Sequence, residues 1–282
     1  MKIAVVGLGL IGGSMAMVLK HRGFASKVIG VDNQQTHTQK ALELGIVDEV
    51  ADLDSAIASS DLVILSAPVS VCEKLLPHIL DLVTHQVVLD TGSTKTSLLE
   101  AVKGHANRGR YIATHPMWGT EFSGPEAATL DAFDGRANVI CDAGESDKDA
   151  LETVERLYKL LGMYNVYMGG KDHDVHVAYV SHISHITSFA LANTVLEKEK
   201  EENAIFELAS AGFESTVRLA KSSPAMWMPI FKQNKENVLD VLNEHITQLR
   251  KFKSCIEKEN WTYLTELMEH ANKIKDVLDR KQ

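Results

Sequence analysis

Residues 2–12, Lys-Ile-Ala-Val-Val-Gly-Leu-Gly-Leu-Ile-Gly, decide the fold of the N-terminal part of this chain. The apolar run predicts a buried strand, and the glycines follow it where a helix is expected to begin. In such a unit Gly7 permits the tight turn, Gly9 lets the backbone approach a pyrophosphate, and Gly12 allows close packing of helix on strand. The predicted cofactor-binding residues of this segment are Gly7, Gly9, Leu10, Ile11 and Gly12.

Asp32 extends this cofactor site. It lies 20 residues after Gly12, at the end of a second apolar run over residues 27–32. Its carboxylate can accept hydrogen bonds from both ribose hydroxyls of a dinucleotide and would repel a 2′-phosphate. The next residues, 33–35, supply no arginine that could bind such a phosphate. The sequence therefore predicts NAD rather than NADP as the cofactor, and the alternative for Asp32 is a simple strand-end cap.

The first 168 residues continue to alternate strands with helices. Strands are expected at 2–7, 27–32, 62–67, 86–90, 111–114, 137–141 and 165–168, and helices at 10–22, 34–44, 71–82, 93–105 and 147–161. Several strands are apolar at consecutive positions, as expected where both faces of a sheet are covered. This alternation predicts an α/β fold, with a doubly wound, Rossmann-type parallel sheet in a dinucleotide-binding domain over residues 1–168.

Helical patterns replace the strands after Gly169-Gly170. They are expected over 173–200, 202–219, 234–258 and 261–278. The sequence thus predicts an all-helical C-terminal domain, residues 169–282, for substrate binding and dimerisation. Four amphipathic helices form a modest core, so we expect a homodimer in which a second copy covers them.

Composition narrows the classes of partner. Lys and Arg number 29 and Asp and Glu 38, which gives a net charge of −9 and argues against nucleic acid or an anionic membrane. No apolar run reaches the ~18 residues of a membrane span, and no leader segment is evident. The three cysteines match no disulfide or zinc spacing. A cytoplasmic location is expected.

Two polar clusters follow later predicted strands: Asp-Thr-Gly-Ser-Thr-Lys at 90–95 and Thr-His-Pro-Met-Trp-Gly-Thr-Glu at 114–121. Ligands of open parallel sheets bind beyond the carboxyl ends of the strands, so both clusters should border the nicotinamide. Ser93 and His115 are the candidates for chemistry. The alternatives are that Ser93 caps the following helix and that His115 is a loop histidine without a catalytic role.

The chain resembles the prephenate/arogenate dehydrogenase family of tyrosine biosynthesis. The matching segments are GLGLIGGS at 7–14, DTGSTK at 90–95, HPMWGTEFSGPEAA at 115–128, SHISH at 181–185 and AGFESTVRLAKSSPAMW at 211–227. The resemblance covers nearly the whole chain. It implies a small-molecule substrate, prephenate or arogenate, and hydride transfer to NAD coupled to loss of CO2. With prephenate the product is 4-hydroxyphenylpyruvate, and with arogenate it is tyrosine.

The resemblance also implies roles for individual residues. His115 would accept the proton of the substrate's ring hydroxyl, and Ser93 would orient His115 or share the contact with that hydroxyl. Arg218 would hold a substrate carboxylate with its planar guanidinium. The further residues implied at the substrate pocket are His185 in its lining, Glu121 as its gate, and Trp227 at its border.

Structural alternatives remain for three of these residues: Arg218 could pair with a helix-face carboxylate, Trp227 could be core, and Glu121 could cap a helix. The chain also departs from the family pattern at Ser215, where an aspartate is expected. A pocket that selects the ammonium group of arogenate should place a carboxylate beside it. Ser215 therefore favours prephenate as the preferred substrate.

The histidines at 173, 176, 182 and 185 suggest a metal site, but helix geometry argues against one. At 100° per residue, the first two centre on the opposite side of the helix from the last two. We therefore predict no metal, with His182 and His185 facing the pocket and His173 and His176 facing solvent or an interface.

Two rival functions remain open. Another two-domain oxidoreductase, of the β-hydroxyacid dehydrogenase or imine reductase type, would use a lysine such as Lys171 and leave His115 without a role. A sensor that binds NAD without turnover would not need Ser93, His115 and Arg218 together.

Overall fold

The computed structural model describes residues 1–202 and 205–279. The chain forms two compact units, Met1–Lys235 and Glu236–Gln282. The first unit contains the sheet and all the residues predicted to bind cofactor or substrate.

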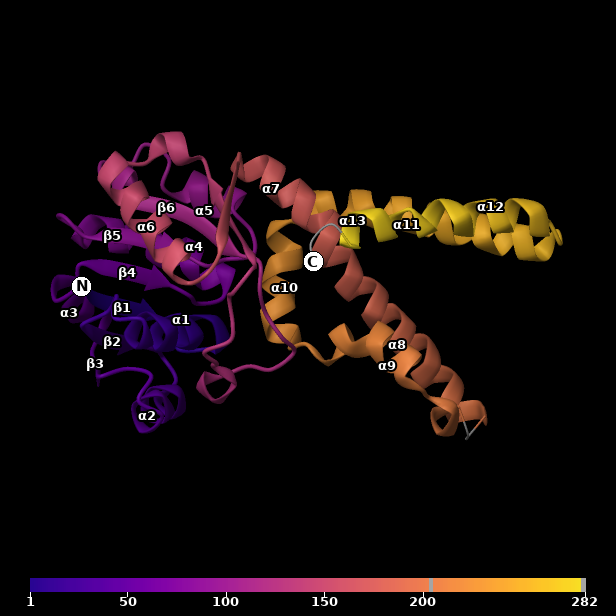
Figure 1. Ribbon diagram of the computed structural model, residues 1–282, viewed down its shortest axis with the longest axis horizontal. Helices are drawn as coiled ribbons and strands as arrows, with labels where there is room; N and C mark the ends of the chain where they lie inside the picture. The colour runs from indigo at the N-terminus through magenta and orange to yellow at the C-terminus, as the bar shows by residue number, and fades with distance from the viewer. Residues whose placement is uncertain (203–204, 280–282) are drawn as a thin grey trace. The chain divides into compact units, whose positions relative to one another are not determined.

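An eight-stranded sheet is the centre of the first unit (Figure 1). Its strands are β1 Lys2–Val6, β2 Lys27–Val31, β3 Glu49–Val50, β4 Leu62–Leu65, β5 Val87–Asp90, β6 Tyr111–Pro116, β7 Ala137–Cys141 and β8 Tyr164–Met168. They lie in the order β3-β2-β1-β4-β5-β6-β7-β8. The predicted doubly wound sheet is confirmed, with two differences: β3 was not expected, and β6 pairs with β7 in antiparallel fashion.

Helices cover both faces of the sheet. They are α1 Leu10–His21, α2 Gln35–Glu43, α3 Leu53–Ala58, α4 Val69–Leu82, α5 Thr96–Ala101 and α6 Lys148–Leu160. Ile3 and Val5 of β1 join one core with α1 and α6, whereas Ala4 and Val6 join a second core with α3, α4 and α5. Because successive strand side chains point to opposite faces, consecutive apolar residues are needed in β1.

The chain leaves β8 through Gly169 into a long helical run. Its parts are α7 Gly170–Val177, a π-helical turn Ala178–His182 and α8 Ile183–Glu202, followed by α9 Ala211–Val217, a 3₁₀ turn Arg218–Lys221 and α10 Pro224–Gln233. The helix expected over 202–219 is replaced, within its described residues, by shorter pieces. The helix α10 was not predicted, although Pro224 occupies its first position, where a missing N–H costs nothing.

The second unit begins at Glu236, the second residue of α11 (Lys235–Glu257). It also contains α12 Trp261–Asn272 and α13 Ile274–Leu278. Asn260 begins α12 by accepting a hydrogen bond from the N–H of Tyr263 (3.2 Å). These helices agree with the pattern of the sequence. Across the described ranges, no helix combines the length and the apolar character needed to cross a bilayer.

Candidate active site

The glycine-rich turn forms a cradle at the carboxyl end of β1. Gly7 has a φ of +98°, and a Cβ there would lie 2.5 Å from the carbonyl oxygen of Ser66. A Cβ on Gly12 would lie 2.1 Å from the carbonyl oxygen of Gly7, whereas one on Gly9 would meet no atom within 4 Å. Gly7 and Gly12 are therefore required by packing. The open space at Gly9, where Leu10 and Ile11 begin α1, fits the close approach of a dinucleotide pyrophosphate.

Asp32 is held at the border of this cradle. Its carboxylate accepts hydrogen bonds from the backbone N–H groups of Leu8 and Gln34, each at 2.9 Å. Asp32 thus does act as a cap, and its remaining lone pairs can still accept ribose hydroxyls. The Nδ1 atom of His37 lies 3.5 Å from the same carboxylate, a neighbour that the sequence did not indicate.

The cradle is continuous with the carboxyl end of β5. Ser66, which follows β4 and abuts Gly7, accepts a hydrogen bond from the Thr91 hydroxyl (2.9 Å). Ser93 lies two residues further on and is partly exposed. It does not cap a helix, because α5 begins only at Thr96. Within the described chain the Ser93 hydroxyl makes no hydrogen bond to His115, so the structure does not support the prediction that Ser93 orients His115. The other predicted role, contact with the substrate hydroxyl, stays a prediction.

A buried ion pair joins the ends of β5 and β6. The side chains of Lys95 and Asp90 are fully buried and hydrogen-bonded to each other. The Lys95 ammonium also donates to the carbonyl oxygen of Thr114 (2.6 Å), and Asp90 accepts from the Tyr111 hydroxyl (2.7 Å). Because Thr114 immediately precedes His115, this network fixes the backbone that carries the predicted base.

His115 lies at the end of β6 and is partly buried. Burial, followed by the positive charges that His173, Lys95 and His182 can carry, lowers the pKa of His115 well below its usual value. The imidazole is therefore neutral near pH 7 and can accept a proton. Its Nδ1 atom lies 2.8 Å from the Nε2 atom of His173.

His173 was predicted to face solvent or an interface, and the first of these is wrong because the side chain is fully buried against His115. His176 is exposed, as predicted. The fixed step of 100° fails because the π-helical turn Ala178–His182 advances the chain by a smaller angle per residue, so His173 and His182 are both buried. No group of three potential metal ligands occurs within residues 1–202 and 205–279.

Arg218 and Glu121, two of the residues predicted at the substrate pocket, pair with each other. The Arg218 guanidinium donates to a Glu121 carboxylate oxygen (3.0 Å), and the Arg218 side chain is 49% exposed. The Glu121 backbone N–H and then Arg218 hold the pKa of this carboxyl below its usual value. The partner of Arg218 is thus the predicted gate residue, which lies on the loop after β6.

Trp227 and His185, two further residues predicted at the pocket, are in ring contact. Their ring centroids are 3.6 Å apart, and the rings are tilted by 31°. Trp227 packs against Val69 of α4 and Ile230 of α10, so the core alternative holds for part of its ring. Its Nε1–H is buried and has no hydrogen-bond partner in the described structure, which leaves a donor for a ligand. Burial lowers the pKa of His185, and the charge of Arg218 lowers it further.

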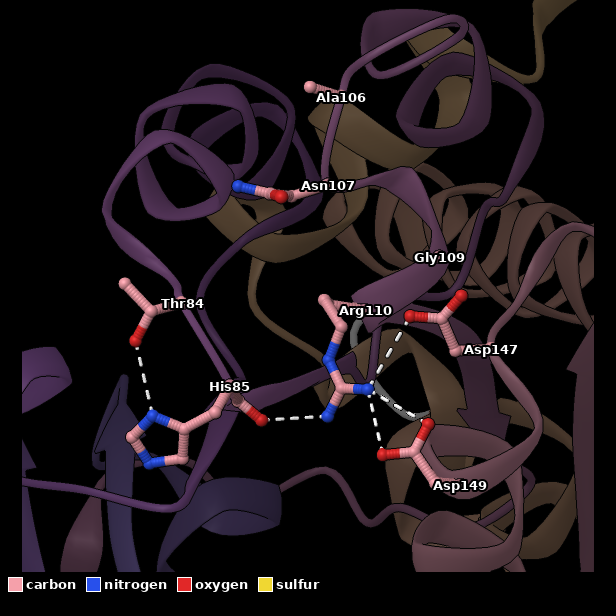
Figure 2. A pocket seen from close by; sticks show the side chains of 8 residues that line it. All are labelled: Thr84, His85, Ala106, Asn107, Gly109, Arg110, Asp147 and Asp149. Carbon is pink, nitrogen blue, oxygen red and sulfur yellow. Dashed lines mark hydrogen bonds and ion pairs between the residues drawn. The ribbon is translucent and has the colours of Figure 1, made fainter.

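A polar cleft of about 470 Å³ lies elsewhere, beside the amino ends of β5 and β6 (Figure 2). Its only arginine is Arg110, whose guanidinium bonds to Asp147, Asp149 and the carbonyl oxygens of His85 and Gln86. This cation is already neutralised, and the cleft is remote from the strand ends that carry the cradle. It is not the active site.

The glycine cradle and the neutral imidazole at the same edge of the sheet define the class: a Rossmann-type oxidoreductase. Models of two protein families match the chain: prephenate dehydrogenase, nucleotide-binding domain, over residues 15–167, and prephenate dehydrogenase, dimerization domain, over residues 170–270. The chain belongs to the prephenate dehydrogenase family. The predicted family is confirmed, and the β-hydroxyacid dehydrogenase or imine reductase alternative is excluded.

Individual relatives agree with this assignment. The chain is 30% identical to a prephenate dehydrogenase of Bacillus subtilis, over 99% of this chain and 76% of that protein. A crystal structure of prephenate dehydrogenase from Aquifex aeolicus with hydroxyphenyl propionate and NAD+ has a TM-score of 0.89 at 32% identity, covering 98% and 97% of the two chains. Arogenate dehydrogenase from Synechocystis has a TM-score of 0.76 at 30% identity, covering 99% and 100%.

Proposed function

We propose that this dehydrogenase catalyses the NAD-dependent oxidative decarboxylation of prephenate to 4-hydroxyphenylpyruvate. The observation that carries the proposal is the neutral His115 imidazole at the carboxyl end of β6, on the same edge of the sheet as the glycine cradle. Mixing the protein with NAD and prephenate and following the NADH absorbance band tests it. Absence of turnover with prephenate would overturn the proposal.

In this mechanism the glycine cradle and Asp32 would hold NAD, which would supply the acceptor for the hydride of the hydroxyl-bearing ring carbon. His115 takes the hydroxyl proton, and even a weak base suffices because a hydroxyl becomes strongly acidic on a carbon that loses hydride. Ser93 shares the contact with that hydroxyl. Arg218 exchanges Glu121 for a substrate carboxylate, and Trp227 and His185 line the ring pocket. Departure of CO2 needs no second base, because formation of the aromatic ring drives it.

The two parts of the chain divide this work. We assign cofactor binding to residues 1–168 and substrate binding and dimerisation to residues 169–282. Apolar side chains exposed on the second unit support a homodimer: Leu249, Ile256, Trp261, Met268, Ile274, Val277 and Leu278. Analytical ultracentrifugation should give twice the mass of one chain, and a monomer at micromolar concentration would contradict the assignment.

Asp32 is proposed to make NAD the preferred cofactor over NADP. Its carboxylate, fixed by two backbone N–H groups, would meet the 2′-phosphate with like charge. The unmodified protein should use NAD far better than NADP, and Asp32→Ser should narrow that gap. Equal kcat/KM with both cofactors in the unmodified protein would contradict this role.

Prephenate is proposed over arogenate because the described segment before Arg218 offers no unpaired carboxylate for an ammonium group. Glu214 lies 3.5 Å from the Lys221 ammonium. The Ser215 hydroxyl donates to the carbonyl oxygen of Gly212 (2.9 Å). A buried substrate ammonium without a carboxylate partner is costly. The measurement is kcat/KM for both substrates with NAD, and a clear preference for arogenate would show that Glu121 or Glu214 reaches the amino group.

A further inference from the structure

His115 is the first member of a hydrogen-bonded chain of three side chains. Its Nδ1 atom is 2.8 Å from His173 Nε2, and His173 Nδ1 is 2.8 Å from a carboxylate oxygen of Asp174. His173 and Asp174 lie in α7, and His173 is 58 residues after His115 in the sequence. Both side chains are buried.

Asp174 is fixed in its ionised form. Its two carboxylate oxygens accept hydrogen bonds from the backbone N–H groups of Lys95 (2.8 Å) and Thr96 (2.9 Å) where α5 begins. Burial raises the pKa of this carboxyl, but the hydrogen bonds from His173, Thr96 and Lys95 outweigh burial and hold it below its usual value. An ionised carboxylate can only accept hydrogen bonds. The proton on the His173 ring is therefore on Nδ1, directed at Asp174.

This assignment sets the proton position on His115. Burial lowers the pKa of His173, so the ring is neutral near pH 7 and its Nε2 atom can only accept. The bond between the two rings must then be donated by His115 Nδ1–H. In a neutral His115 the Nε2 atom is consequently bare.

We propose that His173 and Asp174 are positioning residues that hold His115 in the tautomer with a bare Nε2, ready to receive the substrate's hydroxyl proton. The proposal rests on the proposed function. When the proton moves from the substrate oxygen to His115 Nε2, the Nδ1–H bond to His173 stays in place. The new positive charge on His115 is repelled by the Lys95 ammonium, which donates a hydrogen bond to the carbonyl oxygen of Thr114. The Asp174 carboxylate, acting through His173, offsets this repulsion.

Two substitutions of His173 test whether it positions His115 or only fills space. In His173→Gln the longer amide can present its oxygen near the former Nε2 and still accept from His115. In His173→Asn the shorter amide reaches only the Asp174 side. We expect His173→Asn to lower kcat about 10–100-fold and His173→Gln to keep most of it, with KM for NAD unchanged in both. His176→Gln, on the exposed side of α7, is the matched control and should leave kcat unaltered.

If His173 only fills space, the Asn and Gln variants should lose kcat equally, and that result would overturn the proposal. Nitrogen-15 NMR of the unmodified protein gives a readout that does not depend on any variant folding well. The His115 signals, assigned by their loss in His115→Asn, should show a protonated Nδ1 and a bare Nε2 at pH 7. A protonated Nε2 would overturn the proposal even if prephenate is oxidised. The predicted tautomer without turnover of prephenate would instead overturn the proposed function alone.

Discussion

The two sides of the candidate site are built differently. On the sheet side, His173, Asp174 and the Lys95–Asp90 pair are buried, and each has hydrogen-bond partners from several elements. On the helical side, Arg218 is half exposed and has one carboxylate partner on a loop. The groups proposed for the chemical step are therefore fixed by buried hydrogen bonds, whereas the group proposed for recognition is in a half-exposed ion pair.

The largest effect should come from the sheet side. His115→Asn keeps an amide near the former Nδ1, where it can still bond to His173, but removes the Nε2 base. We expect kcat to fall by about 10²–10⁴-fold with little change in NAD affinity, because a general base typically contributes that much. Steady-state kinetics and NAD titration check this. Near-normal turnover in the variant would remove His115 from the mechanism.

The stability of the sheet side should depend on its buried ion pair. Lys95→Met leaves the Asp90 carboxylate buried with only neutral donors, which should lower the free energy of unfolding by about 3–5 kcal/mol. Lys20→Met is the matched control, since the Lys20–Asp48 pair (2.7 Å) is partly exposed and should contribute about 0–1 kcal/mol. Urea unfolding measures both. Equal losses in the two variants would contradict the contrast between buried and exposed pairs.

Much of this architecture could be predicted from the sequence. Consecutive apolar residues such as Ile3 to Val6 are buried on both faces, and Gly7 and Gly12 have φ angles or contacts that exclude a Cβ, so their pattern has a direct physical cause. These features depend on residues that are close together in the sequence, so the strand and the glycine-rich turn can be predicted without knowledge of the tertiary structure.

What could not be predicted depends on contacts between distant segments. His173 meets His115 across 58 residues, and a π-helical turn changes the phase of the helix that carries the other histidines. The Asp174 carboxylate caps the start of α5, although it is 78 residues away in the sequence. The sequence had suggested Ser93 as a possible cap of this helix. The adjacent histidine and aspartate in the first helix after the last strand were a signal in the sequence, but the pair alone does not show which residue it contacts.

A smaller effect is expected from the helical side. Arg218→Ala should raise KM for the substrate by roughly 30-fold, about 2 kcal/mol, at the low end for a charge pair because Arg218 is half exposed. Arg218→Lys should recover part of this, since an ammonium cannot reproduce the planar fork. The unfolding free energy should change little in either variant. An unchanged KM in the alanine variant would place Arg218 outside the pocket.

The pH dependence of the free energy of unfolding gives the smallest expected effect, counted per histidine and per pH unit. Burial lowers the pKa of His182 to about 4 and lowers those of His115 and His173 below their usual 6.5. The unfolded chain therefore binds more protons than the folded chain once the pH falls below 6.5. Stability from the neutral, buried histidines is complete above pH 6.5 and is lost as the pH falls towards 4, by up to about 1.4 kcal/mol per pH unit for each.

The carboxyl groups lose their contribution in a lower window. The pKa of Glu121 lies below its usual 4.5 and that of Asp174 below 3.8, so both carboxyl groups stay ionised in the folded chain between pH 7 and 5. Urea midpoints measured between pH 7 and 5 should accordingly fall, and the slope should be shallower in His182→Phe, which removes one buried imidazole. His176→Gln should keep the full slope because that side chain is exposed in the folded chain. A midpoint that stays level from pH 7 to 5 would mean that the buried histidines are charged in the folded state. That outcome would also remove the neutral base on which the sheet side of the comparison depends.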